Sequence, residues 1–260
     1  MAVMDEFRAE REAIKSQPFK VRFSYFMDYY KWHVIGISVA VIALCAFIYH
    51  LATAKDFAMN AVLLGAYPLQ EDTSLITQDY AQYAGINLDK EEVYFDSSLY
   101  IITEDNSSDP MSSATSMETT YNSAQILGAR LAAKDLDILT MNPGNFTNYA
   151  YQEIFMDLRQ VLTDEQLASL DGKLYYMDYA FLPELDAIRS KFDYDTPITY
   201  PVYDDPSALE EPVPVGINLA ECSKFNEHFS YPGDKAFVGV AINTTRLDNA
   251  KAFLNYLFED

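Results

Sequence analysis

One short stretch with the pattern of a β-strand is followed by small and polar residues at a spacing suited to ligand binding. The stretch is residues 137–140, and the residues that follow it include Asn142, Gly144, Asn145 and Thr147. The stretch predicts a β-strand, and an Asn followed by a Pro predicts the start of a helix. Exposed amides at such a junction favour an anionic or polar ligand group. These four are candidate ligand-binding residues, with plain helix capping as the alternative.

Tyr67 is a fifth candidate. It follows the apolar stretch 58–66, which predicts another strand, and we expect its side chain to line the same crevice. A simple turn or core position is the alternative for Tyr67.

Catalytic and metal-binding patterns are weak. His33 and His50 lie near the two ends of the longest apolar stretch, which leaves His228 as the one histidine of the remaining chain. One histidine is too few for a His-based zinc site or a catalytic triad. Residues 105–109 offer oxygen ligands, but they lack the Gly and the Glu of a calcium loop. We therefore expect no enzyme activity, no cofactor and no metal.

The longest apolar stretch is residues 32–51, WHVIGISVAVIALCAFIYHL, which contains no Asp, Glu, Lys or Arg. As a helix rising about 1.5 Å per residue, it would cover roughly the 30 Å hydrocarbon core of a bilayer. We expect one transmembrane helix here, with the lipid bilayer as its partner. A cleaved signal peptide is the alternative, because the small residues 52–54 follow the stretch.

The flanking residues predict the orientation of this helix. Residues 1–31 contain six basic side chains, whereas residues 52–66 contain Lys55 alone. Short basic flanks stay in the cytoplasm. We therefore expect residues 1–31 to form a cytoplasmic and interfacial segment, in which 19–31 lie in the inner interface before the helix turns into the membrane. Residues 52–260 are then an extracytoplasmic domain.

The charge of this outer part excludes one class of function. Residues 52–260 hold 12 basic and 34 acidic side chains, a net charge of −22. Such a charge repels nucleic acid, so nucleic acid is not an expected partner. The two cysteines, Cys45 and Cys222, fall on different sides of this division and are not expected to pair. Cys222 is expected to be a buried thiol.

The first half of the outer part alternates between strand and helix patterns. Residues 58–66 are continuously apolar, which predicts a strand buried on both faces, and residues 93–103 predict a second strand. Helical spacing follows over residues 69–83 and again after a capping box at Thr115 and Glu118. This alternation predicts an α/β fold with a mostly parallel sheet flanked by helices.

The remaining elements are shorter. The helix after Thr115 is expected to bury Met117, Tyr121, Ala124, Leu127 and Leu131. A capping box at Thr163 and Gln166 predicts another helix. Residues 193–214 are irregular, and the other predicted elements are strands at 174–181, 215–219 and 236–242 and a final helix at 245–258.

Two segments resemble the extracellular solute-binding proteins. Residues 132–158, with DLDILTMNPGNFTNYAYQEIFMDL, are similar to the family segment in which a strand ends at a ligand-facing turn and a helix follows. Residues 237–260, FVGVAINTTRLDNAKAFLNYLFED, are similar to the strand and helix that end the family's chains. The resemblance implies a type II periplasmic-binding architecture, in which two α/β lobes enclose a ligand cleft and serve uptake transporters.

The chain departs from that family in three respects. It keeps a membrane helix where family members carry a lipid on an N-terminal cysteine, and it is far shorter, so its second lobe must be reduced. Its one Trp, Trp32, lies at the membrane, whereas sugar binders of the family stack their ligand on Trp. The expected fold is therefore a reduced form of this architecture, preceded by one transmembrane helix.

Two functions are expected from these observations. The first is a single-pass cell-membrane protein whose extracellular domain captures or senses a small polar molecule. Its protein partner would be a membrane transporter or another membrane protein. The alternative is a non-enzymatic structural or interaction subunit of a membrane complex that has lost ligand binding.

Overall fold

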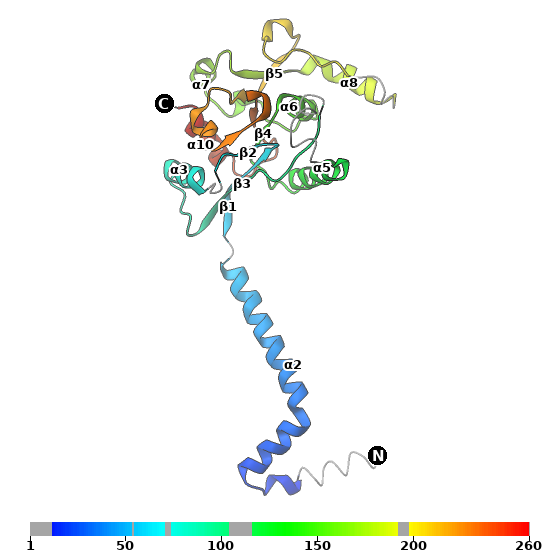
Figure 1. Ribbon diagram of the computed structural model, residues 1–260, viewed down its shortest axis with the longest axis vertical. Coiled ribbons are helices and arrows are strands. Elements are labelled where there is room, and N and C mark those ends of the chain that lie inside the picture. Colours follow the sequence, from blue (N-terminus) through cyan, green and yellow to red (C-terminus); the bar gives the residue numbers. More distant parts are fainter. Residues whose placement is uncertain (1–11, 54, 71–73, 104–115, 192–197, 260) are drawn as a thin grey trace. The chain divides into compact units, whose positions relative to one another are not determined.

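The computed structural model describes residues 12–53, 55–70, 74–103, 116–191 and 198–259, and the chain divides into two compact units, Met1–Ala54 and Lys55–Asp260 (Figure 1). The first unit contains helix α2, Phe19–Thr53. Its residues Lys31–Leu51 are long and apolar enough to cross a membrane, by length and composition. The expected interfacial residues 19–31 continue into this stretch without a break, because no proline follows Pro18 until Pro68.

A mixed six-stranded sheet, in the order β3-β1-β4-β8-β6-β5, runs through the second unit. Its strands are β1 Asp56–Leu64, β3 Glu91–Asp96, β4 Ile138–Met141, β5 Leu174–Asp178, β6 Pro212–Asn218 and β8 Phe237–Val240. β1 pairs in parallel with β3 and β4, whereas β8 lies antiparallel between β4 and β6, and β5 is antiparallel to β6. The predicted α/β fold is confirmed, and β3, β1, β4 and β6 run in the same direction, although the pairings made by β8 and β5 are antiparallel.

A second, two-stranded sheet joins β2, Tyr67–Pro68, to β7, Phe229–Ser230. It is the one other sheet among the described residues. A second α/β lobe, expected from the resemblance, therefore does not occur as a separate sheet of similar size in this part of the chain.

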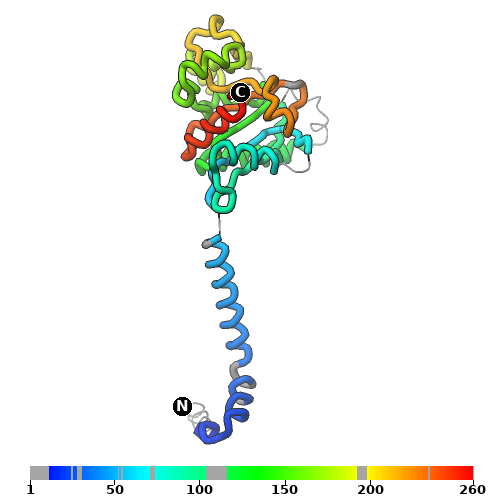
Figure 2. The backbone as a smooth tube through the Cα atoms, turned by 90° about the vertical axis from the view of Figure 1, so that its left-hand side faces the viewer, coloured from blue at the N-terminus to red at the C-terminus, as the bar shows by residue number. Residues whose placement is uncertain are grey.

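Helices cover both faces of the large sheet. On one face lie α3, Ser74–Ala84, and α10, Leu247–Phe258, whose buried residues share one apolar cluster. On the other face lie α5, Met117–Ala132, α6, Pro143–Ala150, and α8, Leu182–Arg189. The shorter α7, Asp164–Ser169, and α9, Ser223–Asn226, pack with the first face. Figure 2 shows α10 and α3 side by side, where the Tyr80 hydroxyl donates to the carbonyl of Asn249.

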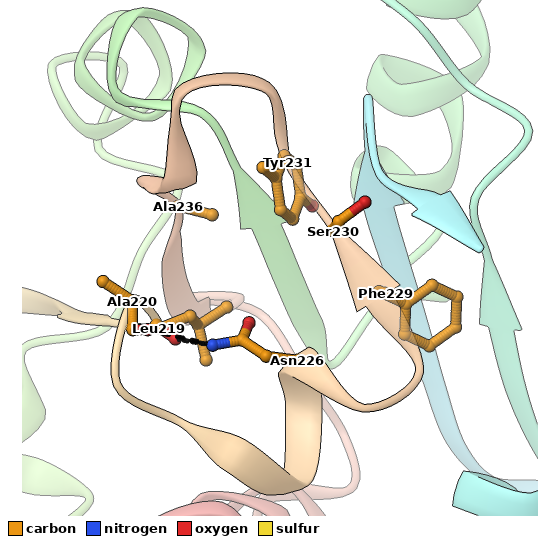
Figure 3. Close-up of a pocket in the computed structure, with 7 residues that line it drawn as sticks. All are labelled: Leu219, Ala220, Asn226, Phe229, Ser230, Tyr231 and Ala236. Carbon is orange, nitrogen blue, oxygen red and sulfur yellow. Dashed lines mark hydrogen bonds between the residues drawn. The ribbon is translucent and has the colours of Figure 1, made fainter. Parts of the chain in front are cut away.

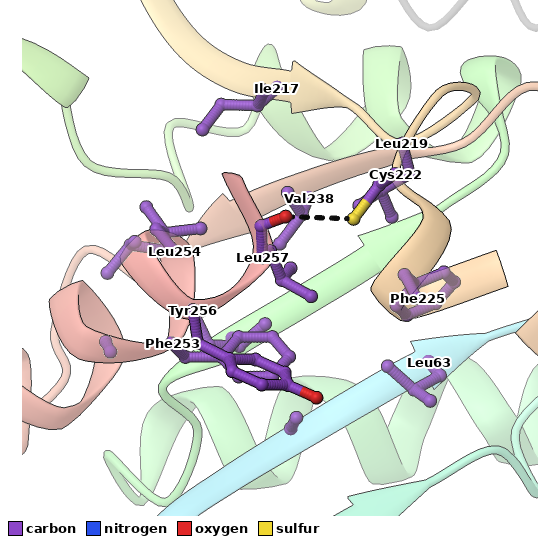
Figure 4. Packing of buried hydrophobic residues seen from close by; sticks show 14 of the residues in the cluster. Leu63, Ile217, Leu219, Cys222, Phe225, Val238, Phe253, Leu254, Tyr256 and Leu257 are labelled. Atoms are coloured by element: carbon purple, nitrogen blue, oxygen red, sulfur yellow. Dashed lines mark hydrogen bonds between the residues drawn. The ribbon is translucent and has the colours of Figure 1, made fainter. Parts of the chain in front are cut away.

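The two apolar clusters meet at β1. Leu63 packs with α3 and α10, while Val62 and Leu64 point to the opposite cluster. Residues 58–64 of this strand are all buried, so the prediction of a strand buried on both faces is confirmed. Figure 4 shows Leu63 facing Phe253 and Leu257 of α10. Cys222 lies in the same cluster as a buried free thiol, and burial raises the pKa of that thiol.

Helix α5 differs from its prediction. Met117 and Tyr121 are exposed, at 74% and 64%, whereas Ser123 and Leu127 are buried. The prediction holds for the later part of the helix, where Leu127 is buried and Ala124 and Leu131 are half-buried, and it is wrong for the first two positions. The helix is capped by Ser116, whose hydroxyl accepts from the backbone N–H of Thr119. Thr115, the predicted cap, lies outside the described residues, as does the candidate calcium loop 105–109.

Two glycines on neighbouring strands allow aromatic rings to approach the sheet closely. The ring of Phe146 lies against Gly216 of β6, and the ring of Phe155 lies against Gly239 of β8. The two rings stack on each other, with centroids 4.3 Å apart. A β-carbon at Gly239 would lie 2.5 Å from Cδ1 of Phe155 and 3.0 Å from the carbonyl oxygen of Val215.

Substitution Gly239→Ala should therefore lower the free energy of unfolding by about 2 kcal/mol, because the added methyl overpacks the core. The measurement is urea unfolding followed by circular dichroism. The matched control is Gly128→Ala, in the interior of α5, where a β-carbon meets no atom within 4 Å. This control should raise stability by roughly 0.5–1 kcal/mol. Equal effects of the two substitutions would contradict this packing.

Candidate functional site

The carboxyl ends of β1 and β4 form the switch point of the sheet. The chain goes from β1 to β3 on one side and returns to β4 on the other, so the segments that follow β1 and β4 diverge at one edge. The two strands end as a pair, with Leu64 opposite Met141. In open α/β sheets, ligands bind at such an edge. The structure therefore brings Tyr67 and Asn142 to the same edge of the sheet.

The side chain of Asn142 caps helix α6. Its Oδ1 accepts from the backbone N–H of Asn145 at 3.0 Å, and Pro143 occupies the first helical position. The capping role foreseen as the alternative for Asn142 is thus present. Gly144 lies half-buried in the first turn of this helix.

The other candidate residues of this helix also bond within the protein. Asn145 is buried, and its Nδ2 donates to the carbonyl of Ile101 at 3.0 Å. The Thr147 hydroxyl donates to the carbonyl of Pro143 and accepts from the hydroxyl of Tyr175. These bonds fix α6 against the segment after β3 and against β5. They engage the Nδ2 of Asn145 and the hydroxyl of Thr147, which were proposed to bind a ligand.

Tyr67 lies in the small β2–β7 sheet. It is half-buried and pairs with Ser230, and the backbone N–H of Leu69 beyond it donates to the carbonyl of His228. This pairing holds the β7 segment against the chain that leaves β1. Tyr67 therefore positions β7 through its backbone.

A cavity of about 410 Å³ lies beside β7, at the same edge of the large sheet (Figure 3). Its lining residues come from the end of β6, from α9 and β7, and from the start of β8: Leu219, Ala220, Asn226, Phe229, Ser230, Tyr231 and Ala236. β8 is antiparallel to β4 and β6, so its first residues lie at the carboxyl ends of those strands. None of the five predicted residues lines this cavity.

The polar groups of the cavity are few and uncharged. Asn226 uses its Nδ2 to donate to the carbonyls of Leu219 and Ala220, both at 3.0 Å. Ser230 contributes a half-buried hydroxyl-bearing side chain. The Tyr231 hydroxyl shares a hydrogen bond with Thr140 of β4, and burial raises the pKa of Tyr231 despite that bond. Its phenol is therefore neutral at physiological pH, and the lining offers an amide, hydroxyls and aromatic surface.

A second cavity of about 410 Å³ lies against β5 and β6. It is lined by Arg159, Leu167, Ala168, Asp171, Leu174, Tyr176, Pro212 and Pro214. The Arg159 guanidinium is engaged by the Asp157 carboxylate, at 2.6 Å from Nη2 to Oδ2. This cavity lies on the strands farthest from the switch point, which makes it the weaker candidate for a ligand site.

The described part of the chain shows neither a cluster of metal ligands nor a reactive thiol. No group of three or more His, Cys, Asp or Glu side chains is placed there to hold a metal ion. Cys222 is buried, and its Sγ lies 3.4 Å from the carbonyl oxygen of Leu257. A buried thiol with a raised pKa is a poor nucleophile.

The cavity residues were not identified by the sequence analysis. They come from residues 219–236, between two apolar stretches that were expected only to return to the sheet. The available signal was the mixture of Asn, His, Tyr and Pro between those stretches, which favours a functional loop once both strands are known to meet at one edge.

Comparison with known proteins gives no match. No family model matches the chain, and neither a curated protein nor a solved structure does.

Substitution Asn142→Ala should lower the free energy of unfolding by about 1 kcal/mol, because it removes the cap of α6. Asn142→Asp is the control, since a carboxylate oxygen can accept from the same N–H and should retain most of the stability. Thermal unfolding followed by circular dichroism distinguishes them. If both substitutions left the melting temperature unchanged, the capping role of Asn142 would be wrong.

Proposed function

We propose that this protein is a single-pass membrane protein whose extracytoplasmic domain captures or senses a small, uncharged polar molecule. The observation that carries the proposal is the cavity beside β7. Its volume of about 410 Å³ lies within the usual range for small-molecule sites, roughly 300–1,000 Å³. It also lies at the carboxyl edge of the sheet, where α/β folds bind ligands.

The electrostatics of the domain disfavour an anionic ligand. Residues 52–260 have a net charge of −22, which lowers the local concentration of anions. The cavity itself has no charged side chain among its lining residues. Aromatic and aliphatic surface, together with one amide and two hydroxyl-bearing side chains, suits a compact molecule with a few hydrogen-bonding groups.

The anchor is part of the same proposal. Helix α2 contains an apolar stretch of 21 residues, Lys31–Leu51, and the charge difference between its flanks favours a cytoplasmic N-terminus. The outer domain would then face the exterior of the cell, where a membrane transporter or another membrane protein would receive the ligand.

The proposal includes a relationship between this domain and the extracellular solute-binding proteins. Both segments that carry the resemblance adopt the expected strand–helix order: β4 leads into α6, and β8 leads through a short turn into α10. The domain would then be a reduced form of the type II periplasmic-binding architecture, with its ligand held at the edge of one sheet.

Ligand binding can be tested by filling the cavity. The full chain in detergent is screened by thermal unfolding against sugars, amino acids, short peptides and ions. A ligand present at a hundredfold excess over its Kd should stabilise the domain by about 2.7 kcal/mol. Substitution Ala220→Phe, at an exposed position of the cavity wall, should abolish that shift.

The matched control is Ala168→Phe, an exposed position in the wall of the second cavity. This variant should retain the ligand-induced shift. If Ala168→Phe abolished the shift and Ala220→Phe did not, the site would be in the wrong cavity.

The topology predicts which residues are accessible in intact cells. Protease added outside should remove a carboxyl-terminal tag, because residues 52–260 would be exterior, whereas an amino-terminal tag should stay protected. The measurement is immunoblotting before and after detergent lysis. A protected carboxyl terminus would exclude this orientation, and a released, soluble domain would favour a cleaved signal peptide.

The second candidate function is a structural or interaction subunit without a ligand. It is favoured by one observation, the internal hydrogen bonding of Asn142, Asn145 and Thr147, which engages side-chain groups that were predicted to bind a ligand. If no compound raises the melting temperature while a membrane protein co-purifies with the full chain, this function replaces the first.

A further inference from the structure

The amino ends of β1 and β3 extend beyond the rest of the sheet. β3 pairs with β1 from Asp56 onward, whereas β4 pairs with β1 only from Ala61. At about 3.3 Å per residue, the four residues that precede Asn60 extend roughly 13 Å. Residues 56–60 and 91–94 form this β1–β3 tip, and Figure 1 shows the two strands at one end of the second unit.

Two aromatic side chains lie exposed on the β1–β3 tip. Phe57 is 37% exposed and Tyr94 is 41% exposed, and their ring centroids are 6.4 Å apart. Aromatic rings at this exposure gain free energy if another surface covers them.

The charged residues around this pair are mostly acidic. Asp56 and Glu92 are exposed and Glu91 is half-buried, while Lys90 is the exposed cation of the adjoining turn. The ammonium of Lys55 donates to the carbonyl of Leu88 and keeps its positive charge, and Asp89 of the adjoining turn is exposed, so four carboxylates outnumber two cations here. The β1–β3 tip therefore combines aromatic faces with three carboxylates, and both attract ammonium groups.

The short connection between helix α2 and β1 limits the distance between the β1–β3 tip and the end of α2. Helix α2 ends at Thr53, and β1 begins at Asp56. Phe57 is four residues beyond Thr53, so the two are at most about 14 Å apart along a fully extended chain. The headgroup layer extends roughly 5–7 Å beyond the hydrocarbon core on each side. A helix that crosses the bilayer at residues 31–51 thus keeps Phe57 near the headgroups.

We propose that the β1–β3 tip contacts the outer headgroup layer, with Phe57 and Tyr94 in the layer and with zwitterionic phospholipids as the partner. The inference rests on the membrane anchor of the proposed function. Aromatic side chains favour this depth, and the three carboxylates favour the ammonium groups of phosphatidylcholine or phosphatidylethanolamine over an anionic surface. The contact places the cavity edge, at the other ends of β1 and β4, away from the bilayer.

Trp fluorescence tests this contact, because Trp32 is the one Trp of the chain. The full chain is reconstituted in phosphatidylcholine vesicles that contain lipids brominated close to the headgroup. Trp32→Phe is combined in turn with Phe57→Trp and Tyr94→Trp, both at exposed aromatic positions. Bromine should quench each new Trp several-fold more than it quenches the control variant.

The control is Tyr121→Trp in the same background. Tyr121 is exposed on α5, nine residues before Arg130, and Arg130 contacts Asp96 at the carboxyl end of β3 and Asn60 at the inner limit of the β1–β3 tip. Because α5 connects the end of β3 to the start of the parallel strand β4, it runs toward the amino ends of the strands, so Tyr121 lies farther from the β1–β3 tip than Arg130 does. All variants are first compared with the parent by circular dichroism. Weak quenching at position 121 together with strong quenching at positions 57 and 94 supports the contact.

Quenching of Trp32 in the unsubstituted chain distinguishes a failure of the headgroup contact from a failure of the membrane anchor. If Trp32 is quenched but positions 57 and 94 behave like 121, the anchor stands and the headgroup contact is wrong. If Trp32 is not quenched, the anchor itself is wrong and the contact falls with it. Vesicles of phosphatidylglycerol at low salt should reduce quenching at position 94 several-fold. Equal or greater quenching there would overturn the assignment to zwitterionic lipid.

Discussion

The position of β1 between two parallel neighbours determines most of the architecture. A parallel neighbour on each side requires a crossover connection for each pairing, and right-handed crossovers that proceed in opposite directions place their helices on opposite faces. Helix α3 connects β1 to β3 on one face, and α5 connects β3 to β4 on the other. The three layers, the burial of β1 on both faces and the switch point all follow from this arrangement.

A buried carboxylate fixes the amino side of the same strands. Asp137 is fully buried, and its Oδ2 accepts from the backbone N–H of Asn60 and from Nε of Arg246, at 2.8 and 2.7 Å. Its Oδ1 accepts from the hydroxyl of Thr244. A buried charge is tolerated only when it is paired and hydrogen-bonded. Asp137 therefore ties β1, β4 and the turn before α10 into one unit.

A second carboxylate holds the edge strand. Burial alone would raise the pKa of Asp96, but hydrogen bonds from Ser98 and Arg130 outweigh it and lower that pKa below its ordinary value. The stabilisation is present above the pKa of the unfolded state and is lost as the pH falls through the folded-state pKa. Arg130 also donates to Asn60 at 2.9 Å, so the pair joins α5 to both β1 and β3.

Local patterns in the sequence predicted the elements but not how distant segments meet. The apolar residues 58–64, the cap at Asn142 and the capping box at Thr163 are short-range features, and all three occur. The insertion of β8 between β4 and β6 depends on pairing across the whole domain, which no local pattern encodes. The cavity lies at that insertion, so its residues could not be read from spacing alone.

The start of α6 and the cavity beside β7 differ in what their polar groups already do. Around α6, Asn142, Asn145 and Thr147 satisfy backbone or side-chain partners, so a ligand would have to break bonds that support the fold. Beside β7, Asn226 and Tyr231 use their polar groups to fix the cavity wall, and the space between them stays open. A wall held by its own hydrogen bonds is preorganised, which reduces the entropic cost of binding. The same edge of the sheet thus carries the capped amino end of α6, which stabilises the fold, and an adjacent cavity whose wall is held by hydrogen bonds.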